Sequence, residues 1–95
     1  MAAQPIVDSD IDFVREALER IVPADRPRRI EVFRSSGPFI RAIVVSDDFQ
    51  GQGATARQER MWGQLRGALP PDLLNRLFGV HPYTWDEFNE EFQEN

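Results

Sequence analysis

The run from Phe39 to Ser46 constrains the fold of this chain more than any other segment. It reads FIRAIVVS, is rich in β-branched residues, and is apolar on both faces except at Arg41. A strand with two apolar faces is typical of the interior of a sheet, where both faces are covered. The sequence therefore predicts a sheet that has this run as its central strand and helices packed on it.

The segments before this run predict a helix and a second strand. Apolar residues recur at helical spacing from Ile11 to Val22, directly after the capping cluster Asp8–Asp10. Arg29–Arg34 is β-branched and aromatic, which favours a strand. The turn-forming residues Ser35–Pro38 separate it from the central run, so we expect the two strands to form a hairpin.

The segments after the central run predict a loop and a second helix. Asp47–Gly53 is polar and contains glycine, as loops do. Thr55–Gln58 has the form of a capping box, and apolar residues at helical spacing continue to Leu69. Pro70 and Pro71 should end this helix.

The C-terminal quarter predicts a third strand and a third helix. Asp72–Asn75 is interpreted as a turn, and Arg76–His81 as a strand whose length Pro82 limits. Thr84–Glu87 is a second capping box. One face of the helix that follows carries Trp85, Phe88 and Phe92. The predicted order is αββαβα, an α+β fold with a three-stranded mixed sheet, and the pairing position of the third strand stays open.

Composition narrows the chemistry. The 95 residues suit one domain, with residues 1–8 and 93–95 as expected flexible ends. The chain has no Cys, a single His at position 81, and eleven cationic residues that are all Arg. Disulfide scaffolds, cysteine nucleophiles and Schiff-base lysines are thereby excluded, and no set of metal ligands or nucleophile–base pair can be assembled. We therefore expect a protein that is not an enzyme and has no resident cofactor.

Charge is distributed unevenly along the chain. The net charge is -5, but all eleven Arg lie between residues 13 and 80, where they outnumber the acidic residues. This overall charge argues against strong nonspecific DNA binding, which needs a dense basic surface. No apolar run is long enough to span a membrane, and the N-terminal residues do not have the pattern of a signal peptide. We expect a cytoplasmic protein without a membrane partner.

The best candidates for a binding surface are arginines. Arg57 and Arg60 are three residues apart on the second helix, with Arg66 further along and Arg76 after it. Guanidinium groups suit bidentate recognition of phosphate or carboxylate. The alternative is an ordinary solvated helix face. His81 is interpreted as a structural residue, since a metal site needs further ligands and a base needs an oriented partner.

The segment VVSDDFQGQGATARQERMWGQL, which begins at Val44, resembles the BolA-like family. The family pattern is a strand ending in V-V-S, then D-x-F-x-G, an Arg-His pair at a helix start, and a helix with an aromatic residue and a Leu three residues after it. The matching positions are Ser46, Asp47, Phe49, Gly51, Arg57, Trp62 and Leu65. The helix that begins at Thr84 also fits the family. The resemblance implies a KH-like fold of the second topology.

The resemblance implies a protein-binding module. Proteins of this family are partners of monothiol glutaredoxins, with which they share a two-iron two-sulfur cluster, and some are linked to stress response or transcription regulation. In this chain Gln58 stands at the position of the helix-start His, and Arg76 at that of the strand His. The hairpin turn Ser35–Pro38 contains neither His nor Cys. Iron in such clusters needs thiolate or imidazole, so we expect no ligation of the family kind at these positions, and a cluster shared with a partner stays open as the alternative.

The sequence thus predicts a regulatory or accessory partner of a monothiol glutaredoxin or another iron–sulfur carrier. We expect the partner at the surface formed by Arg76, the second helix with Arg57, Gln58 and Arg60, and the hairpin turn. The alternative is a KH-like nucleic-acid-binding or transcription-regulating domain that sets Arg57 and Arg60 on phosphates. The oligomeric state stays open.

Overall fold

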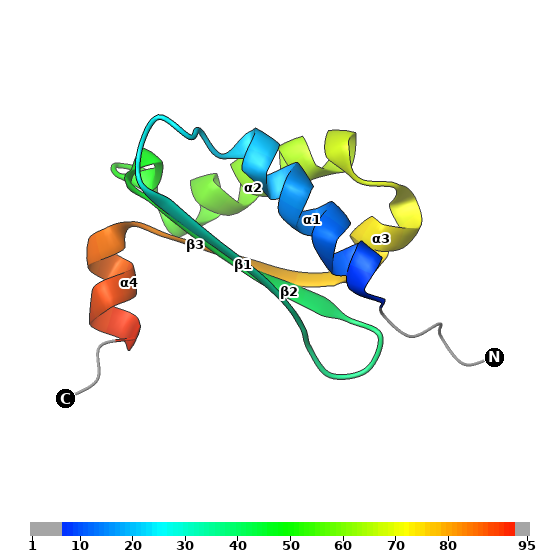
Figure 1. Cartoon of the computed structure of the whole chain (residues 1–95). Helices are drawn as coiled ribbons and strands as arrows, with labels where there is room; N and C mark the ends of the chain where they lie inside the picture. The colour runs from blue at the N-terminus through cyan, green and yellow to red at the C-terminus, as the bar shows by residue number, and fades with distance from the viewer. Residues whose placement is uncertain (1–6, 93–95) are drawn as a thin grey trace.

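The computed structural model describes residues 7–92 and contains the central strand that the sequence predicts (Figure 1). The elements in chain order are α1 (Asp8–Ile21), β1 (Arg28–Arg34), β2 (Ile40–Ser46), the 3-10 helix η1 (Asp47–Phe49), α2 (Ala54–Ala68), α3 (Pro71–Arg76), β3 (Leu77–Tyr83) and α4 (Trp85–Phe92). The predicted flexible ends at residues 1–6 and 93–95 lie outside the described residues. Val7 and Asp8, which were grouped with them, form the N-cap and the first residue of α1.

The sheet has the order β1-β2-β3, with β2 in the centre. β1 and β2 form the predicted antiparallel hairpin, in which Phe33 lies opposite Arg41. β3 joins the other edge of β2 in parallel, which the local pattern alone left undecided. The predicted α+β fold with a mixed three-stranded sheet is therefore confirmed.

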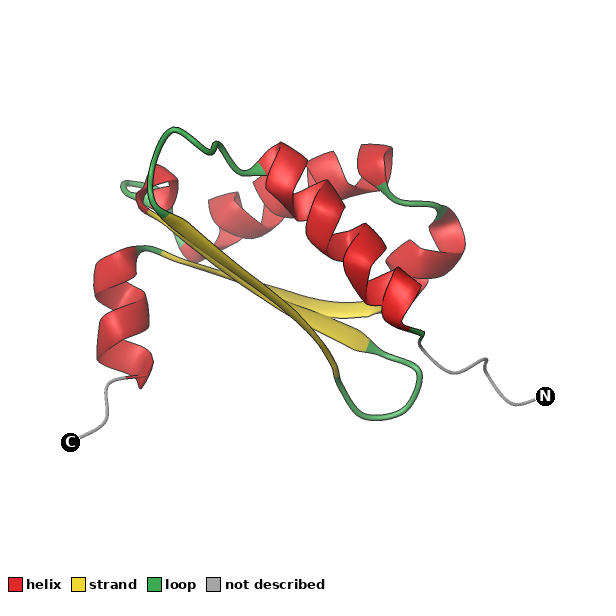
Figure 2. Ribbon diagram, viewed as in Figure 1, coloured by secondary structure: helices red, strands yellow, loops and turns green. Residues whose placement is uncertain are grey.

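Helices cover one face of the sheet (Figure 2). α1 packs on β1 and against α2, and α2 contacts β3 and α3. The core between these layers is apolar, and its innermost side chains are fully or almost fully buried. They include Val14, Leu18, Ile40, Val44, Phe49, Met61, Leu65 and Val80. This burial of apolar area supplies most of the driving force for folding in a chain that has no disulfide.

The second face of the sheet is covered only at one end. There α4 packs against β2 and β3 and buries Val45, which belongs to this face. The ring centres of Phe88 on α4 and Tyr83 are 6.2 Å apart, and the guanidinium of Arg29 lies 5.3 Å from the Phe88 ring centre. Toward the hairpin turn, none of the described helices covers this face (Figure 1).

An irregularity in β3 determines which of its side chains reach the core. Leu77 and Val80 are both buried although they are three residues apart, which strict alternation forbids. The register shifts between Ile40 and Arg41, so that Leu77 pairs with Ile40 but Gly79 with Arg41. A bulge of this kind adds one residue and changes the direction of a side chain. The extra residue is Phe78, which is 59% exposed.

Three predictions for the segment from residue 72 to residue 82 are wrong, for reasons of backbone chemistry and packing. The interpreted turn Asp72–Asn75 lies inside helix α3, because Pro71 has a fixed φ that suits the first helical position and Leu73 is buried against the core. Arg76, expected to begin the third strand, is the last residue of that helix, and β3 extends instead from Leu77 to Tyr83. Pro82 does not end the strand, because β3 is an edge strand and the missing N–H breaks no ladder.

The predicted caps differ in outcome. Thr84 and Glu87 form the expected capping box, in which each backbone N–H donates to the other residue's side chain at 2.8 and 3.2 Å. The capping box at Thr55 is wrong, because α2 begins at Ala54 with Gly53 as N-cap and has no side-chain cap. α1 likewise begins earlier than predicted, and the Asp10 carboxylate accepts from the Val7 N–H.

No helix among residues 7–92 combines the length and the apolar character that crossing a bilayer requires.

The packing predicts a clear difference between two phenylalanines. Phe49 is 1% exposed, so Phe49→Ala should lower the free energy of unfolding by about 3–5 kcal/mol through lost burial and a cavity. Phe78→Ala, at an exposed position, should cost less than about 1 kcal/mol. Urea denaturation followed by circular dichroism measures both values. Equal losses would contradict this assignment of core and surface.

Candidate functional site

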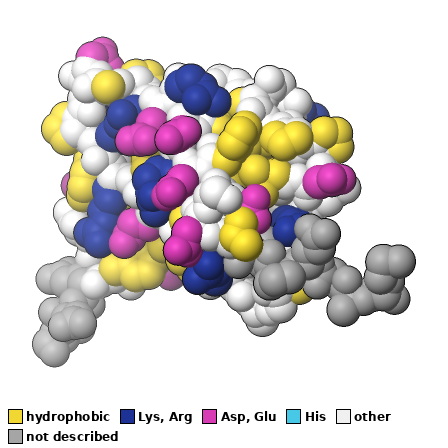
Figure 3. Space-filling view, turned by 45° about the vertical axis from the view of Figure 1, so that its right-hand side comes forward, with side chains coloured by type: hydrophobic (Ala, Val, Ile, Leu, Met, Phe, Trp, Pro, Cys, Tyr) yellow, Lys and Arg dark blue, Asp and Glu magenta, His cyan; other side chains and the backbone are white. Residues whose placement is uncertain are grey.

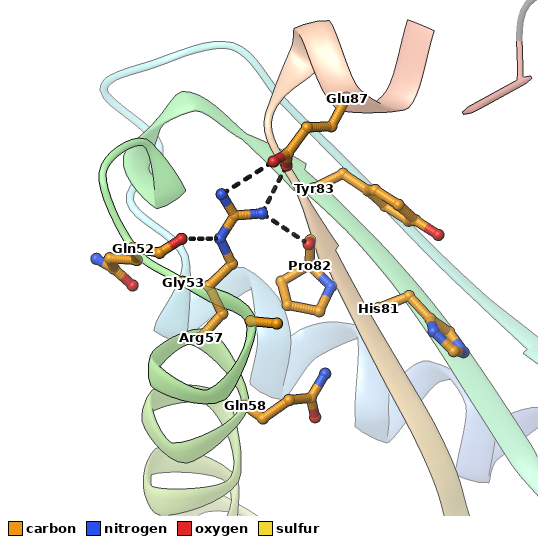
Figure 4. A pocket seen from close by; sticks show the side chains of 9 residues that line it. Gln52, Gly53, Arg57, Gln58, His81, Pro82, Tyr83 and Glu87 are labelled. Atoms are coloured by element: carbon orange, nitrogen blue, oxygen red, sulfur yellow. Dashed lines mark hydrogen bonds and ion pairs between the residues drawn. The ribbon is translucent and has the colours of Figure 1, made fainter. Parts of the chain in front are cut away.

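The guanidinium of Arg57 connects three parts of the chain at the start of α2 (Figure 4). Its Nε donates to the carbonyl of Gln52 at 2.8 Å, and Nη1 donates to the carbonyl of Pro82 at 3.4 Å. Both terminal nitrogens also bind the carboxylate of Glu87, at 2.5 and 3.1 Å. The Arg57 side chain is only 12% exposed. Arg57 therefore acts as a joint between the loop before α2, the end of β3 and the start of α4.

The partner of Arg57 is held in its charged form. That partner is Glu87, whose pKa is lowered to about 2. The largest cause is the hydrogen bond from Arg57, and the next is the hydrogen bond from the Thr84 backbone. The same carboxylate thus completes the capping box of α4 and ties that helix to α2. The nearby Tyr83 has a raised pKa, because burial and the charges of Glu91 and Glu87 disfavour its phenolate.

Gln58, the second predicted partner-binding residue, is also engaged within the chain. Its Nε2 donates to the carbonyl of Val80 at 2.9 Å, and its Oε1 accepts from the indole N–H of Trp62 at 2.9 Å. These two contacts fix the orientation of the amide. Arg57 and Gln58 donate to the carbonyls of Pro82 and Val80, which point outward from the free edge of β3. Another strand therefore cannot pair with these carbonyls.

Arg60 lies on the same helix but serves a different contact. It pairs with Asp48, and its guanidinium lies 5.4 Å from the ring centre of Phe49. The pair is about one quarter exposed on each side. Two of the predicted surface arginines, Arg57 and Arg60, are therefore each bound to a carboxylate of the chain itself.

A cavity of about 320 Å³ lies between the start of α2 and β3. Arg57, Gln58 and Glu87 line it, together with His81 from β3 (Figure 4). His81 was interpreted as structural and not as a site residue, and the structure places it in the middle of an edge strand beside this cavity. Its ring lies close to Gly79, where a Cβ would come within 3.1 Å of the imidazole Nε2.

The structure separates Arg76 from the other predicted site residues. Arg76 ends α3, and its Nη1 lies 3.9 Å from the carboxylate of Asp10. It lines a different cavity of about 360 Å³, with Phe13 and Leu73 among its neighbours. The expected single surface of Arg57, Gln58, Arg60 and Arg76 is therefore divided between two places.

Most of the remaining motif positions support the backbone near the end of β2. Ser46 is buried, and its Oγ accepts from the Asp48 N–H. The Asp47 carboxylate accepts from the Trp85 N–H at 3.1 Å, which attaches α4 to η1. Gly51 has φ +81°, a left-handed conformation that glycine adopts without steric cost. Phe49 and Leu65 are core residues.

The charges of the described surface are mixed. Acidic and basic side chains alternate over the face shown in Figure 3, without a continuous basic area. Six Arg–carboxylate pairs occur within residues 7–92, and those of Arg57 and Arg60 are among them. Such neutralised arginines are poorly placed to bind phosphates, because binding would first have to break an ion pair.

Sequence reasoning missed an aromatic surface on the uncovered part of the sheet. It consists of Phe33, Phe39, Phe78 and Arg41, and we call it the open-face surface. The three phenylalanines are 40%, 37% and 59% exposed. The Phe39 and Phe78 ring centres are 5.6 Å apart, and the Arg41 guanidinium lies 4.8 Å from the Phe78 ring centre. The exposed side of a hairpin with two phenylalanines was the available signal, but the exposure of Phe78 depends on the bulge.

The chain offers little to an iron–sulfur cluster. Among residues 7–92 there is no group of three or more His, Cys, Asp or Glu that could hold a metal ion. Gln58 and Arg76 carry neither thiolate nor imidazole and do not fit iron. His81 is the single side chain of the whole sequence with a nitrogen of that kind.

Comparisons with known proteins leave the family open. No protein-family model matches the chain, and no curated protein matches it significantly. A solved structure described as the solution structure of the XC975 protein is similar, with 26% identity and a TM-score of 0.48. The alignment covers 92% of this chain and 99% of that one. At this TM-score the similarity carries no functional argument.

The joint predicts a specific pH dependence. The folded-state pKa of Glu87, about 2, lies below its ordinary value of 4.5. Its charge therefore contributes stability that is fully present above about pH 4.5 and is lost as the pH falls toward 2. Glu87→Gln keeps a side chain suited to the capping box but removes the charge. The gap in unfolding free energy between wild type and this variant should shrink between pH 4.5 and 2 in urea titrations.

The matched control is Glu90→Gln on the same helix. Glu90 has no arginine partner among the described residues, so its variant should show a small gap that does not vary in this way. A Glu87→Gln gap that stays constant from pH 7 to pH 2.5 would contradict the assigned role of the ion pair.

Proposed function

We propose that this protein is a non-catalytic, BolA-like protein-binding module whose partner is a monothiol glutaredoxin or a similar iron–sulfur carrier. The resemblance of the segment from Ser46 to Leu65 supports the choice of partner. The observation that carries the binding role is the open-face surface, where three phenylalanines remain exposed on the same side of the sheet and two of them are in ring contact. Clustered exposed apolar side chains on a small domain mark an interaction site.

The open-face surface lies at the same end of the sheet as two parts of the expected partner surface, the hairpin turn and Arg76. The hairpin turn joins β1 to β2 there, and Ile40 at the start of β2 pairs with Leu77 at the start of β3. Arg76 directly precedes Leu77 in the chain. The hairpin turn and Arg76 thus remain near one another in the fold, whereas Arg57, Gln58 and Arg60 act within the chain.

The proposed role is recognition of the partner. Since Gln58 and Arg76 do not fit iron, the proposal assigns no step to a cluster on this chain, and thiolate ligands would come from the partner. A cytoplasmic location and a contribution to stress response or transcription regulation belong to the same proposal and rest on the resemblance alone. The ion pairs of Arg57 and Arg60 weigh against the nucleic-acid alternative.

A titration tests the proposal. Isotope-labelled protein is titrated with apo and with cluster-loaded monothiol glutaredoxin, and amide chemical shifts are recorded. We expect the largest changes in the hairpin turn and in Leu77–Gly79. Phe78→Ser should weaken binding about tenfold or more, as loss of a large aromatic contact does at interfaces.

The matched control is Phe92→Ser, which replaces an exposed phenylalanine on α4, at the other end of the sheet from the hairpin turn, and should leave binding unchanged. Absence of any chemical-shift change with both forms of glutaredoxin would reject the partner.

A further inference from the structure

We infer that the open-face surface binds an extended protein segment that carries an acidic side chain between apolar ones. The apolar side chains of this segment would lie on Phe33, Phe39 and Phe78, and its carboxylate would pair with Arg41. This inference rests on the proposed protein-binding function and adds the chemistry of the segment that is recognised.

The strand register arranges the surface as a row across the sheet. Phe33 of β1 lies opposite Arg41 of β2, and Arg41 lies opposite Gly79 of β3. The bulge exposes Phe78 next to Gly79, and the Arg41 guanidinium lies 4.8 Å from the Phe78 ring centre. Phe39 lies against Phe78 at the hairpin end of the row. The sequence of groups along the row is apolar, cationic, apolar.

Arg41 is a cation that the chain leaves without a counter-charge. Among the described residues no carboxylate pairs with it, although two arginines of β1 do have acidic partners. Arg29 binds Glu31 at 3.1 Å, and Arg34 binds Asp8 at 2.8 Å. The Nε of Arg41 is also buried and has no hydrogen-bond partner within residues 7–92. A half-buried guanidinium of this kind favours a carboxylate, which it can bind in a bidentate manner.

Charge complementarity selects an acidic partner segment. Because Glu31 is already bound by Arg29, Arg41 leaves the row with one net positive charge. The low polarity of the surrounding rings strengthens an ion pair formed there. A basic segment would meet an uncompensated like charge, and a wholly apolar one would bury Arg41 without a partner.

The same surface is poorly suited to single-stranded nucleic acid. Aromatic rings on an open sheet can stack bases, but such proteins also provide a basic groove along the phosphates. Here one unpaired arginine stands on the row, and the net charge of the chain is -5. A protein segment is therefore the occupant that the charges favour, and an oligonucleotide becomes a control in the test.

Selection from a random-peptide library displayed on phage tests the inference with the full chain as bait. We expect enriched peptides to contain Asp or Glu with apolar neighbours. A synthetic copy of an enriched peptide should shift the amide resonances of Phe33, Arg41 and Phe78. Arg41→Gln should weaken its binding about tenfold to hundredfold, as loss of hydrogen bonds to a charged group does.

Two matched comparisons make the test specific. Arg66→Gln replaces an exposed arginine of α2 and should leave peptide affinity unchanged. Exchanging the peptide's acidic residue for its amide should weaken binding to wild type but cause little further loss with Arg41→Gln, as a double-mutant cycle requires for a direct pair. Phe39→Ser serves as a second aromatic variant if Phe78→Ser fails to fold by circular dichroism.

Several outcomes would overturn the inference. They are no enriched peptide, enriched peptides without an acidic residue, equal affinity for Arg41→Gln, or the same shifts with a short oligothymidylate. Peptide binding at Arg41 without any glutaredoxin binding would reject the proposed partner and keep this inference. Glutaredoxin binding that Arg41→Gln leaves unchanged would reject this inference and keep the proposed function.

Discussion

The arrangement of the second half of the chain depends on the contacts that the guanidinium of Arg57 makes. A single, largely buried cation binds the loop before α2, the edge of β3 and the first turn of α4. Glu87 forms an ion pair with this cation, and the same carboxylate caps α4. Asp47 adds a hydrogen bond from η1 to the same helix start. Buried charges need partners of this kind, and here the partners come from elements far apart in the sequence.

The position of α4 in turn determines where the molecule can bind. Because the joint holds α4 at one end of the second sheet face, the helix covers Val45 and leaves the hairpin end open. The bulge in β3 then exposes Phe78 there while Leu77 and Val80 stay in the core. The joint and the open-face surface are thus two consequences of one packing arrangement. The joint uses Arg57, one of the arginines predicted to bind a partner, and the open-face surface supplies the exposed groups on which the proposals rest.

Much of the secondary structure could be predicted because its signals are local. The apolar spacing of α1, the β-branched run of β2 and the capping box at Thr84 act within a few residues. The errors arose where a neighbour in space intervened. Asp72–Asn75 forms a helix because Leu73 finds a place in the core, and β3 passes through Pro82 because no strand lies beyond its outer edge. For the site, the sequence identified Arg57, Gln58 and Arg60 as candidates, but it could not predict which groups of the chain they contact. The partner remains a prediction.

The sequence by itself determined the α+β fold, the central strand, and the absence of thiol and lysine chemistry, because residue type and periodicity act locally and composition is fixed. Only the tertiary structure decided that Arg57, Gln58 and Arg60 bind within the chain and that Arg76 lies apart from them. It likewise decided that Arg41 and three phenylalanines share an uncovered face. The physical reason is that ion pairing and burial depend on distances between segments, which are set when helices and strands pack and not by the order of residues along the chain.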